Sequence, residues 1–236
     1  MKRIFIYLFI LSSFSINAQN LFTKKNVKSI SNDEIEKKTK GCFSYPGLFT
    51  IYQSKKDGKS YLEIDSSHLN KEYIYFSYYE NGVLDAGSVK GRFRGSKIIK
   101  IKKFYENIDI TIQNTNYFFN EDSPLNKASN TNINTPIIIS EKIIAKNQNN
   151  TKFLINADNI FLNESFQQVK SSYYPGYKGF KLGNLSKTKT RYKKIRNYPE
   201  NTDVIVNYIY ESKYPSKRGS SAVTDSRNIS VLVQHS

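Results

Sequence analysis

Residues 47–94 read GLFTIYQSKKDGKSYLEIDSSHLNKEYIYFSYYENGVLDAGSVKGRFR, and this stretch decides the fold class. Apolar and β-branched residues predict a strand over Leu48–Gln53 and a return strand over Ser60–Ile64. Lys55-Lys56-Asp57-Gly58 lies between the two, and Asp and Gly tolerate the positive φ of a tight hairpin. We therefore expect β-hairpins laid end to end.

The same pattern of short strand and turn continues along the chain. Aromatic residues predict a third strand over Tyr73–Tyr79, closed by an Asn81-Gly82 turn. Gly95-Ser96 is expected to turn the chain into a strand over Lys97–Phe104. Residues 108–113 alternate Ile with polar side chains, which predicts a half-buried strand.

The second half of the chain predicts more strands and little helix. Strands are expected at Tyr117–Phe119, Lys152–Asn156, Asp203–Tyr210 and Asn228–Gln234, and a strand or a strand pair at Pro136–Ala145. A helical turn is expected at Leu125–Ser129, and a short helix over Ala157–Ser165 with Asp158 as its N-cap. About ten short strands with minor α content predict an all-β fold, either an antiparallel twisted sheet or a β-sandwich.

The strand expected over Asn228–Gln234 carries apolar side chains on both faces. Ile229, Val231 and Val233 point to one side and Leu232 to the other. Strands of this kind are expected where both faces are buried. We expect the strand to pair within the sheet and to leave an apolar surface that another domain covers, and we expect the natural sequence to continue past Ser236.

The N-terminal segment is typical of exported proteins. Residues 1–18, MKRIFIYLFILSSFSINA, have a basic start, a short apolar run and a small-residue end, which predicts a signal peptide cleaved after Ala18. The apolar run is short for a transmembrane span, although an uncleaved anchor is the alternative. Residues 19–40 are expected to be a polar linker in which Ser31–Glu34 can cap one helical turn, and residues 41–236 a β-rich domain. The mature protein is then expected in the periplasm, on the outer surface of the cell or in the medium.

The chain is basic, with 36 Lys and Arg against 20 Asp and Glu and a formal net charge of +16. Such a charge favours anionic partners. Because the lysines are scattered, we interpret the charge as a composition bias and expect no nucleic-acid partner. Arg191–Arg196 mixes cations with a tyrosine, which in an exported protein indicates a solvated strand face or contact with an anionic surface.

The residues that usually carry metal or catalytic chemistry are scarce. The chain has one cysteine, Cys42, and two histidines, His68 and His235. This composition excludes an internal disulfide and the Cys₄ and Cys₂His₂ zinc sites, and no H-E-x-x-H motif is present. A triad with a histidine base is not indicated either. We therefore predict no catalytic, cofactor-binding or metal-binding residue in this chain.

Four pieces of the sequence carry a resemblance. They are residues 47–53 with 61–64, residues 69–76 with 85–87, Tyr198-Pro199-Glu200-Asn201, and residues 227–236 (RNISVLVQHS). In order and spacing they resemble the N-terminal region of large exported bacterial zinc-dependent metalloproteases, whose N-terminal domains have no assigned function. The resemblance covers roughly residues 41–236.

The resemblance implies a non-catalytic role. In that family the last of these pieces leads towards a catalytic domain, where an H-E-x-x-H helix binds zinc and its Glu activates water. No such residue can be carried over here, so zinc is expected only in a catalytic domain of the same or a neighbouring polypeptide, and the chain alone is expected to be inactive. It would support the folding, shielding or substrate orientation of that domain. The alternative is a stand-alone exported module whose basic, Tyr-rich surface binds an anionic surface, glycan or peptide.

We predict that the exported protein begins at Gln19, because the basic start and apolar run precede a small-residue cleavage site at Ala18. Mass spectrometry of the secreted or periplasmic protein measures this directly. A mature protein that still begins at Met1 would contradict the signal-peptide assignment.

Overall fold

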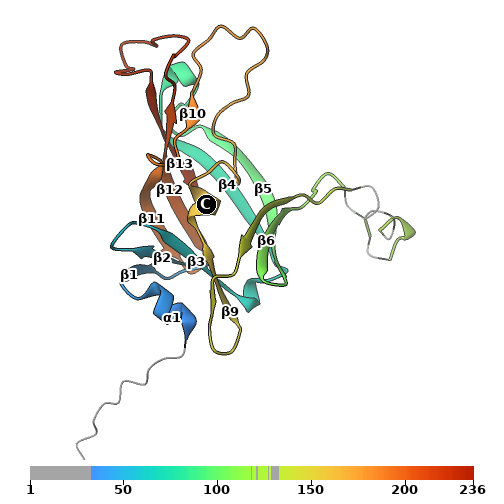
Figure 1. Ribbon diagram of the computed structural model, residues 1–236. Helices are drawn as coiled ribbons and strands as arrows, with labels where there is room; N and C mark the ends of the chain where they lie inside the picture. Colours follow the sequence, from blue (N-terminus) through green and yellow to red (C-terminus); the bar gives the residue numbers. More distant parts are fainter. Residues whose placement is uncertain (1–32, 118, 121, 127, 129–132) are drawn as a thin grey trace, which may run out of the picture. The chain divides into compact units, whose positions relative to one another are not determined.

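The computed structural model describes residues 33–117, 119–120, 122–126, 128 and 133–236. The predicted signal peptide and residues 19–32 of the predicted linker lie outside this part. Within it, the chain is built mainly of antiparallel strands with a few short helices (Figure 1). The predicted all-β fold class with minor α content is therefore confirmed.

The described residues form thirteen strands in two sheets, rather than about ten. The smaller sheet has the order β1-β2-β3-β9-β8, with bounds β1 Cys42–Tyr45, β2 Thr50–Ser54, β3 Ser60–Asp65, β9 Lys152–Asn156 and β8 Ala145–Lys146. The larger sheet has the order β10-β12-β13-β4-β5-β6-β7, and β11 pairs with β12. Its bounds are β10 Asn184–Leu185, β12 Asn201–Glu211, β13 Asn228–His235, β4 Glu72–Asn81, β5 Phe93–Phe104, β6 Asn107–Ile112, β7 Ile137–Lys142 and β11 Arg191–Tyr198.

Four short helical elements have both ends described: α1 (Glu34–Thr39), η1 (Ser66–His68), η2 (Leu84–Ala86) and α3 (Asp158–Phe161). Helix α1 begins after Asp33, whose Oδ1 accepts hydrogen bonds from the backbone N–H groups of Ile35 and Glu36. Ile35 is buried against Ala145 and Leu154. Residues 33–40 of the predicted linker are therefore a capped and packed helix.

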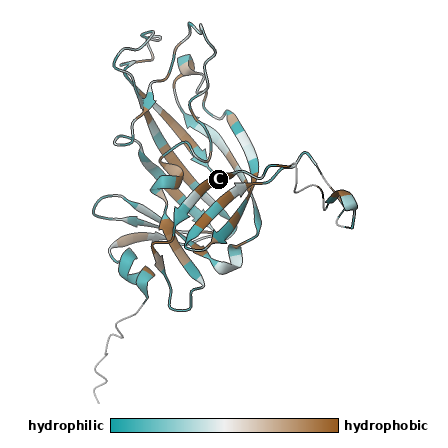
Figure 2. Cartoon of the chain, turned by 45° about the vertical axis from the view of Figure 1, so that its right-hand side comes forward, coloured by the Kyte–Doolittle hydropathy of each residue, from teal (hydrophilic) through white to brown (hydrophobic). Residues whose placement is uncertain are grey.

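The core consists of alternate side chains from the strands of both sheets and of the segment after α3 (Figure 2). Phe166 of that segment stacks on Tyr75 of β4 with ring centroids 4.8 Å apart. Strand β6 buries Asp109 and Thr111 as well as Ile108 and Ile110, so it is not half-buried as predicted. The Asp109 carboxylate accepts a 2.5 Å hydrogen bond from the Ser140 hydroxyl of β7, which satisfies this buried group.

Gly95-Ser96 is not a turn. Gly95 lies inside β5 at a β-bulge opposite Ser77 and Tyr78, with a φ of 139° that a side chain would disfavour. The chain instead reverses over residues 82–92, where η2 ends at Gly87 in the left-handed conformation. The Asn81-Gly82 pair therefore starts a long connection and does not form a tight turn.

Two further sequence predictions are wrong in detail. Tyr117 and Phe119 are not in a strand. Asp158 is the first residue of α3, and Ala157 is its N-cap. The Asp158 carboxylate instead accepts a 3.0 Å hydrogen bond from the Ser60 backbone N–H, so it joins α3 to β3. Burial raises the pKa of this carboxyl group.

Strand β13 pairs within the sheet, as predicted, and lies between β12 and β4. Ile229, Val231 and Val233 are buried, and Leu232 is half-buried. The strongly exposed apolar side chains nearby lie on the neighbouring strand β4, where Ile74 is 69% exposed and Phe76 is 36% exposed.

Asn197 of β11 joins the two sheets, because its Nδ2 donates to the carbonyls of Tyr45 (2.7 Å) and Phe49 (2.5 Å). Its Oδ1 accepts a 2.7 Å hydrogen bond from the Thr202 hydroxyl. We predict that Asn197→Ala lowers the free energy of unfolding by about 2–3 kcal/mol, since partly buried partners lose their hydrogen bonds. Urea denaturation measures the change.

The matched control is Asn184→Ala, because Asn184 is exposed on the short strand β10. Its urea midpoint should stay close to that of the unaltered chain. Equal midpoints for the two variants would contradict the role of Asn197.

Candidate functional site

A cavity of about 420 Å³ opens beside the end of β13. Residues 72–76 of β4 line one side of it, and residues 200–202 of the β11–β12 hairpin line the other. His235 and Ser236 lie at one end, and Leu48 and Phe49 also contribute to the lining. We call this space the His235 cavity.

The walls of the His235 cavity are mostly apolar. They include Ile64, Ile99, Ile101, Phe161 and Phe166, which belong to the main core. The polar groups of its lining include Glu72 and Glu200, both exposed, and Asn201. An apolar space with a few polar groups is the usual form of a binding site in proteins.

Both ring nitrogens of His235 are hydrogen-bonded. Its Nδ1 lies 2.8 Å from the Tyr75 hydroxyl, and its Nε2 lies 2.9 Å from the Tyr208 hydroxyl. Tyr208 donates its proton to the Phe161 carbonyl at 2.6 Å. The Tyr208 oxygen must therefore accept from an Nε2–H group, which leaves Nδ1 to accept from Tyr75.

Burial lowers the pKa of His235 to about 3, because the imidazolium would lose its hydration. Burial likewise raises the pKa of Tyr75 and of Tyr208. The three side chains are thus neutral near pH 7, and both ring nitrogens of His235 are occupied. In this arrangement His235 serves as neither a general base nor a metal ligand.

The other residues weighed in the sequence lie apart from this network. His68 packs its ring edge-on against Phe49, with ring centroids 5.1 Å apart, and burial lowers its pKa. Cys42 lies in β1, and burial raises the pKa of its thiol. Across residues 33–236, outside the gaps named above, no group of three or more His, Cys, Asp or Glu side chains is placed to hold a metal ion.

A polar cluster on the other face of the sheet fixes residues 234–236. Arg196 donates to the Gln234 side chain at 2.5 Å and lies 3.6 Å from the Asp203 carboxylate. The Ser236 hydroxyl donates to the same carboxylate at 2.7 Å. These contacts hold the end of β13 against β12.

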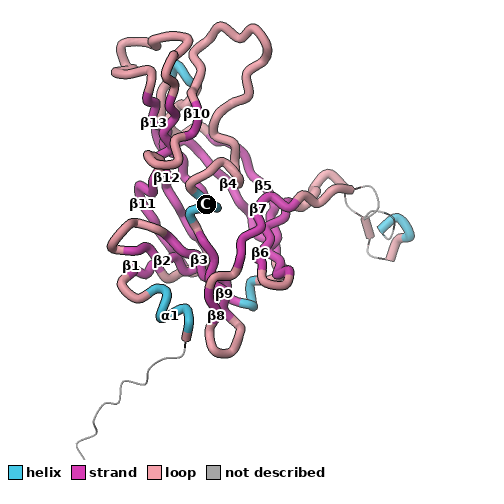
Figure 3. Tube along the Cα trace, viewed as in Figure 1, coloured by secondary structure: helices cyan, strands magenta, loops and turns pink. Residues whose placement is uncertain are grey.

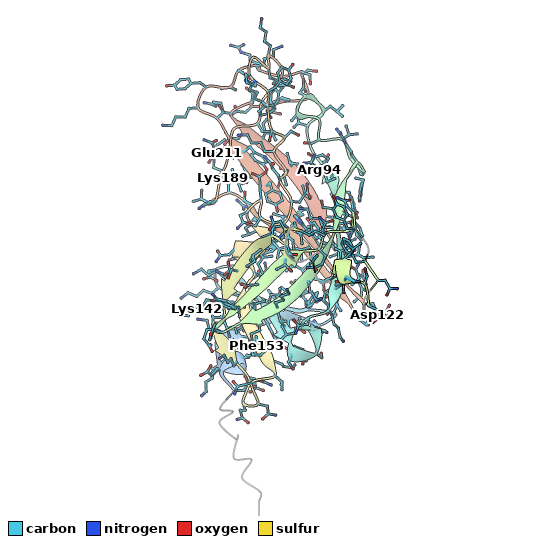
Figure 4. The ribbon with its side chains drawn as sticks, turned by 90° about the vertical axis from the view of Figure 1, so that its right-hand side faces the viewer. Arg94, Asp122, Lys142, Phe153, Lys189 and Glu211 are labelled. Carbon is cyan, nitrogen blue, oxygen red and sulfur yellow. The ribbon has the colours of Figure 1, made fainter. Side chains whose placement is uncertain are left out.

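The segment Arg191–Arg196, singled out for its cations, forms most of β11. Arg191, Lys193 and Lys194 are exposed, whereas Ile195 is buried. Lys189, just before the strand, lies beside Glu211 with a 2.5 Å ion pair (Figure 4). The basic side chains therefore form a solvated strand face, one of the two interpretations offered by the sequence.

Long loops without helix or strand follow α3 and β12, at residues 162–183 and 212–227 (Figure 3). In the first loop Tyr173 and Tyr177 stack with ring centroids 5.1 Å apart, and the Lys181 ammonium lies 5.9 Å from each ring. Tyr214 in the second loop is 91% exposed. These loops present aromatic rings and cations together.

Sequence reasoning did not find the His235 cavity. Its walls come from segments that are far apart in sequence, near residues 48, 74, 201 and 235. None of these segments has a motif for binding. The one usable signal was the position of His235 on the inward, apolar side of β13, in step with Val231 and Val233.

The comparisons with known proteins identify two sequence families. A family described as domain of unknown function DUF5118 matches residues 33–82, and one described as domain of unknown function DUF5117 matches residues 91–236. No curated protein and no solved structure matches the chain. Among the described helices, none is long and apolar enough to cross a membrane.

We predict that His235 makes the stability of the protein depend on pH. A histidine in the unfolded chain takes up a proton near pH 6.5, whereas folded His235 does so only near pH 3. Neutral His235 therefore contributes fully to the free energy of unfolding above pH 6.5. This contribution is lost as the pH falls towards 3, by up to about 1.4 kcal/mol per pH unit.

His235→Phe should remove this dependence and also lower the free energy of unfolding at pH 7 by about 2–4 kcal/mol, because two buried hydroxyls lose their partner. Urea denaturation of both proteins between pH 7 and pH 5 tests the prediction. Identical pH slopes for the two proteins would contradict it.

Proposed function

For a chain that belongs to the DUF5117 family, we propose a non-catalytic role as the N-terminal β domain of an exported zinc-dependent metalloprotease-like protein. The chain packs against the catalytic domain of that protein and supports its folding, its shielding or the orientation of its substrate. Export follows from the signal peptide predicted for residues 1–18. Zinc and the H-E-x-x-H motif belong to the catalytic domain.

The observation that carries this proposal is the His235 cavity with the apolar side chains beside it. Ile74 and Phe76 are exposed on β4, next to Ser236 and at the border of the cavity. Contiguous apolar surface of this kind is typical of sites where another polypeptide binds. The only histidine at the site is neutral and fully hydrogen-bonded, so the site favours packing over chemistry.

The sequence resemblance supports the same role. Residues 227–236 resemble the strand that leads towards the catalytic domain; they include β13, and His235 and Ser236 at its end line the cavity. Two residues of the stretch that carries the resemblance therefore belong to the site proposed to meet the catalytic domain.

A second candidate function rests on the two long loops. Stacked Tyr173 and Tyr177 with Lys181 nearby, and exposed Tyr214, are side chains that suit an anionic glycan or surface. In this case the chain would be a stand-alone exported module.

We predict that residues 19–236 bind a zinc metalloprotease catalytic domain encoded in the same reading frame or a neighbouring gene, with one-to-one stoichiometry. Ile74→Ser should weaken this binding at least about tenfold, since a buried apolar anchor contributes about 1–2 kcal/mol or more. Titration calorimetry measures stoichiometry and affinity.

The matched control is Ile137→Ser on β7, because Ile137 has a similar exposure of 59% and lies away from the cavity. Ile137→Ser should leave the affinity for the catalytic domain unchanged. If the chain does not bind the catalytic domain but binds an anionic glycan in a salt-sensitive manner, the role as a metalloprotease N-terminal domain is contradicted. The stand-alone binding module is then favoured.

A further inference from the structure

Three segments at one end of the larger sheet carry a strong positive charge. They are residues 82–92 between β4 and β5, residues 171–189 before β11, and residues 212–227 between β12 and β13 (Figure 3). Together these 46 of the 236 residues contain ten Lys and Arg and two acidic residues, a net charge of +8. Cations that are scattered along the sequence thus gather at one end of the fold, which holds half of the net charge of +16.

Strand pairing and hydrogen bonds bring the three segments together. Glu211 at the end of β12 pairs with Asn228 at the start of β13, and β10 pairs with the last two residues of β12. The Asp85 carboxylate of η2 accepts hydrogen bonds from the Ser220 backbone N–H at 3.1 Å and from the Ser220 hydroxyl at 2.7 Å. Because β13 begins here, this end of the sheet is opposite to the end that carries the His235 cavity.

The acidic residues of these segments do not neutralise the cations. Asp225 forms an ion pair with Arg227, whose hydrogen bonds lower the pKa of Asp225 to about 2. Asp85 is the other acidic residue, and its two oxygens are held by the contacts described above. No ion pair between described residues includes Lys217 or Arg218, which are both exposed. Positive charge at this end of the sheet is therefore available to an anionic ligand.

A cleft of about 600 Å³ lies among the three segments. Tyr177, Gly179 and Phe180 line it from one segment, and residues 217–220 line it from another. Asp85 of η2 completes the lining. Aromatic rings therefore meet two cations and one carboxylate in a space of the size usual for small-molecule sites. We call this space the Tyr177 cleft.

Packing holds the walls of the Tyr177 cleft in place. Tyr177 stacks on Tyr173 with ring centroids 5.1 Å apart, and the Lys181 ammonium lies 5.9 Å from each ring. Gly219 lies so close to Phe180 that an added Cβ would be 3.1 Å from that ring, so the two walls are in contact. A site that is already formed loses less conformational entropy when its ligand binds.

The side chains of the cleft suit a sugar that carries an acid group. A sugar ring has C–H groups on its faces, and these pack on an aromatic ring such as Tyr177. A carboxylate on the sugar pairs with Lys217, or in bidentate form with Arg218. The Asp85 carboxylate suits the hydroxyl groups of the sugar, because each of its oxygens can accept more than one hydrogen bond. Asp85 would repel a ligand that is densely charged and has no hydroxyl groups.

We propose that the Tyr177 cleft binds an acidic polysaccharide built of uronic-acid units. One sugar ring packs on Tyr177, its carboxylate pairs with Lys217 or Arg218, and its hydroxyls donate to Asp85. Neighbouring units of the polymer lie over the other cations of the three segments. The identity of this ligand deepens the second candidate function and rests on it. Because the cleft and the His235 cavity lie at opposite ends of the sheet, a polysaccharide and a catalytic domain can be bound at the same time.

Titration calorimetry of the exported protein with three probes tests the class of ligand. Oligogalacturonate has both the sugar ring and the carboxylate, its methyl ester lacks the charge, and oligoglutamate lacks the sugar. The Kd for oligogalacturonate should be at least about tenfold lower than the Kd for either of the others, because each of them lacks one kind of contact. Equal affinity for oligogalacturonate and either control would overturn the proposal, as would tighter binding to duplex DNA or to phosphatidylglycerol vesicles.

Lys217→Glu combined with Arg218→Glu tests the site itself. Both side chains are exposed, so the fold should be kept while the Kd for oligogalacturonate rises at least about tenfold. The matched control is Lys193→Glu combined with Lys194→Glu on β11, which changes the net charge equally on another exposed face. At physiological salt this control should change the Kd less than about twofold, since its charges lie outside the cleft and are screened. Equal losses for the two pairs would overturn the site.

Tyr177→Leu tests the aromatic contact separately from the charge. It should raise the Kd for oligogalacturonate about three- to tenfold, whereas Tyr177→Phe keeps the ring and should leave the Kd unchanged. Either an unchanged Kd for Tyr177→Leu or an equal rise for both variants would overturn the role of the ring.

These outcomes are separable from those of the proposed function. If the catalytic domain binds but oligogalacturonate does not, the Tyr177 cleft is not a polysaccharide site and the role as an N-terminal domain stands. If oligogalacturonate binds and only the Lys193 and Lys194 pair weakens it, the second candidate function stands. In that case the binding site lies on β11, and the assignment to the Tyr177 cleft is overturned.

Discussion

The hydrogen bonds of His235 are the interaction on which the rest of the larger sheet depends. The ring lies on β13 and reaches Tyr75 of β4 on one side and Tyr208 of β12 on the other. A buried polar group is costly unless its partners are present, so the three strands are held in a single alignment. Phe161 and Phe166 pack around the same ring cluster, which connects the network to the core.

The position of β4 has a consequence for the two families. Strands β1 to β4 lie within the DUF5118 match, and β5 to β13 lie within the DUF5117 match. Because β4 lies between β13 and β5, it is a central strand in a sheet whose other members belong to DUF5117. The two matched families therefore build one sheet, and the buried contacts of His235 cross the boundary between them. Arg94 of β5 adds to this, since its guanidinium lies 4.8 Å from the Tyr79 ring of β4 (Figure 4).

The alternation of apolar and polar residues predicted the fold class and many strands, because this pattern can be read from neighbouring residues alone. Lys152–Asn156 was predicted with its observed bounds, and Asn228–Gln234 differs from β13 by one residue. Gly95 shows where local reasoning fails, since a glycine at a bulge and a glycine in a turn look alike until the partner strand is known. The His235 cavity was beyond prediction for the same reason: tertiary pairing brings its walls together, and His235 alone carries no signal of its two tyrosine partners. Asp158 was assigned to a cap because its partner, the Ser60 N–H, is distant in sequence.

The account depends on a neutral His235 whose two nitrogens are both engaged, because this state fixes the strands and excludes base or metal chemistry at the cavity. Nitrogen-15 NMR of the imidazole ring tests it most directly. The account predicts an Nε2–H tautomer with unprotonated Nδ1 at pH 7, unchanged down to pH 5. A ring that titrates near pH 6.5, or that carries its proton on Nδ1, would contradict the account.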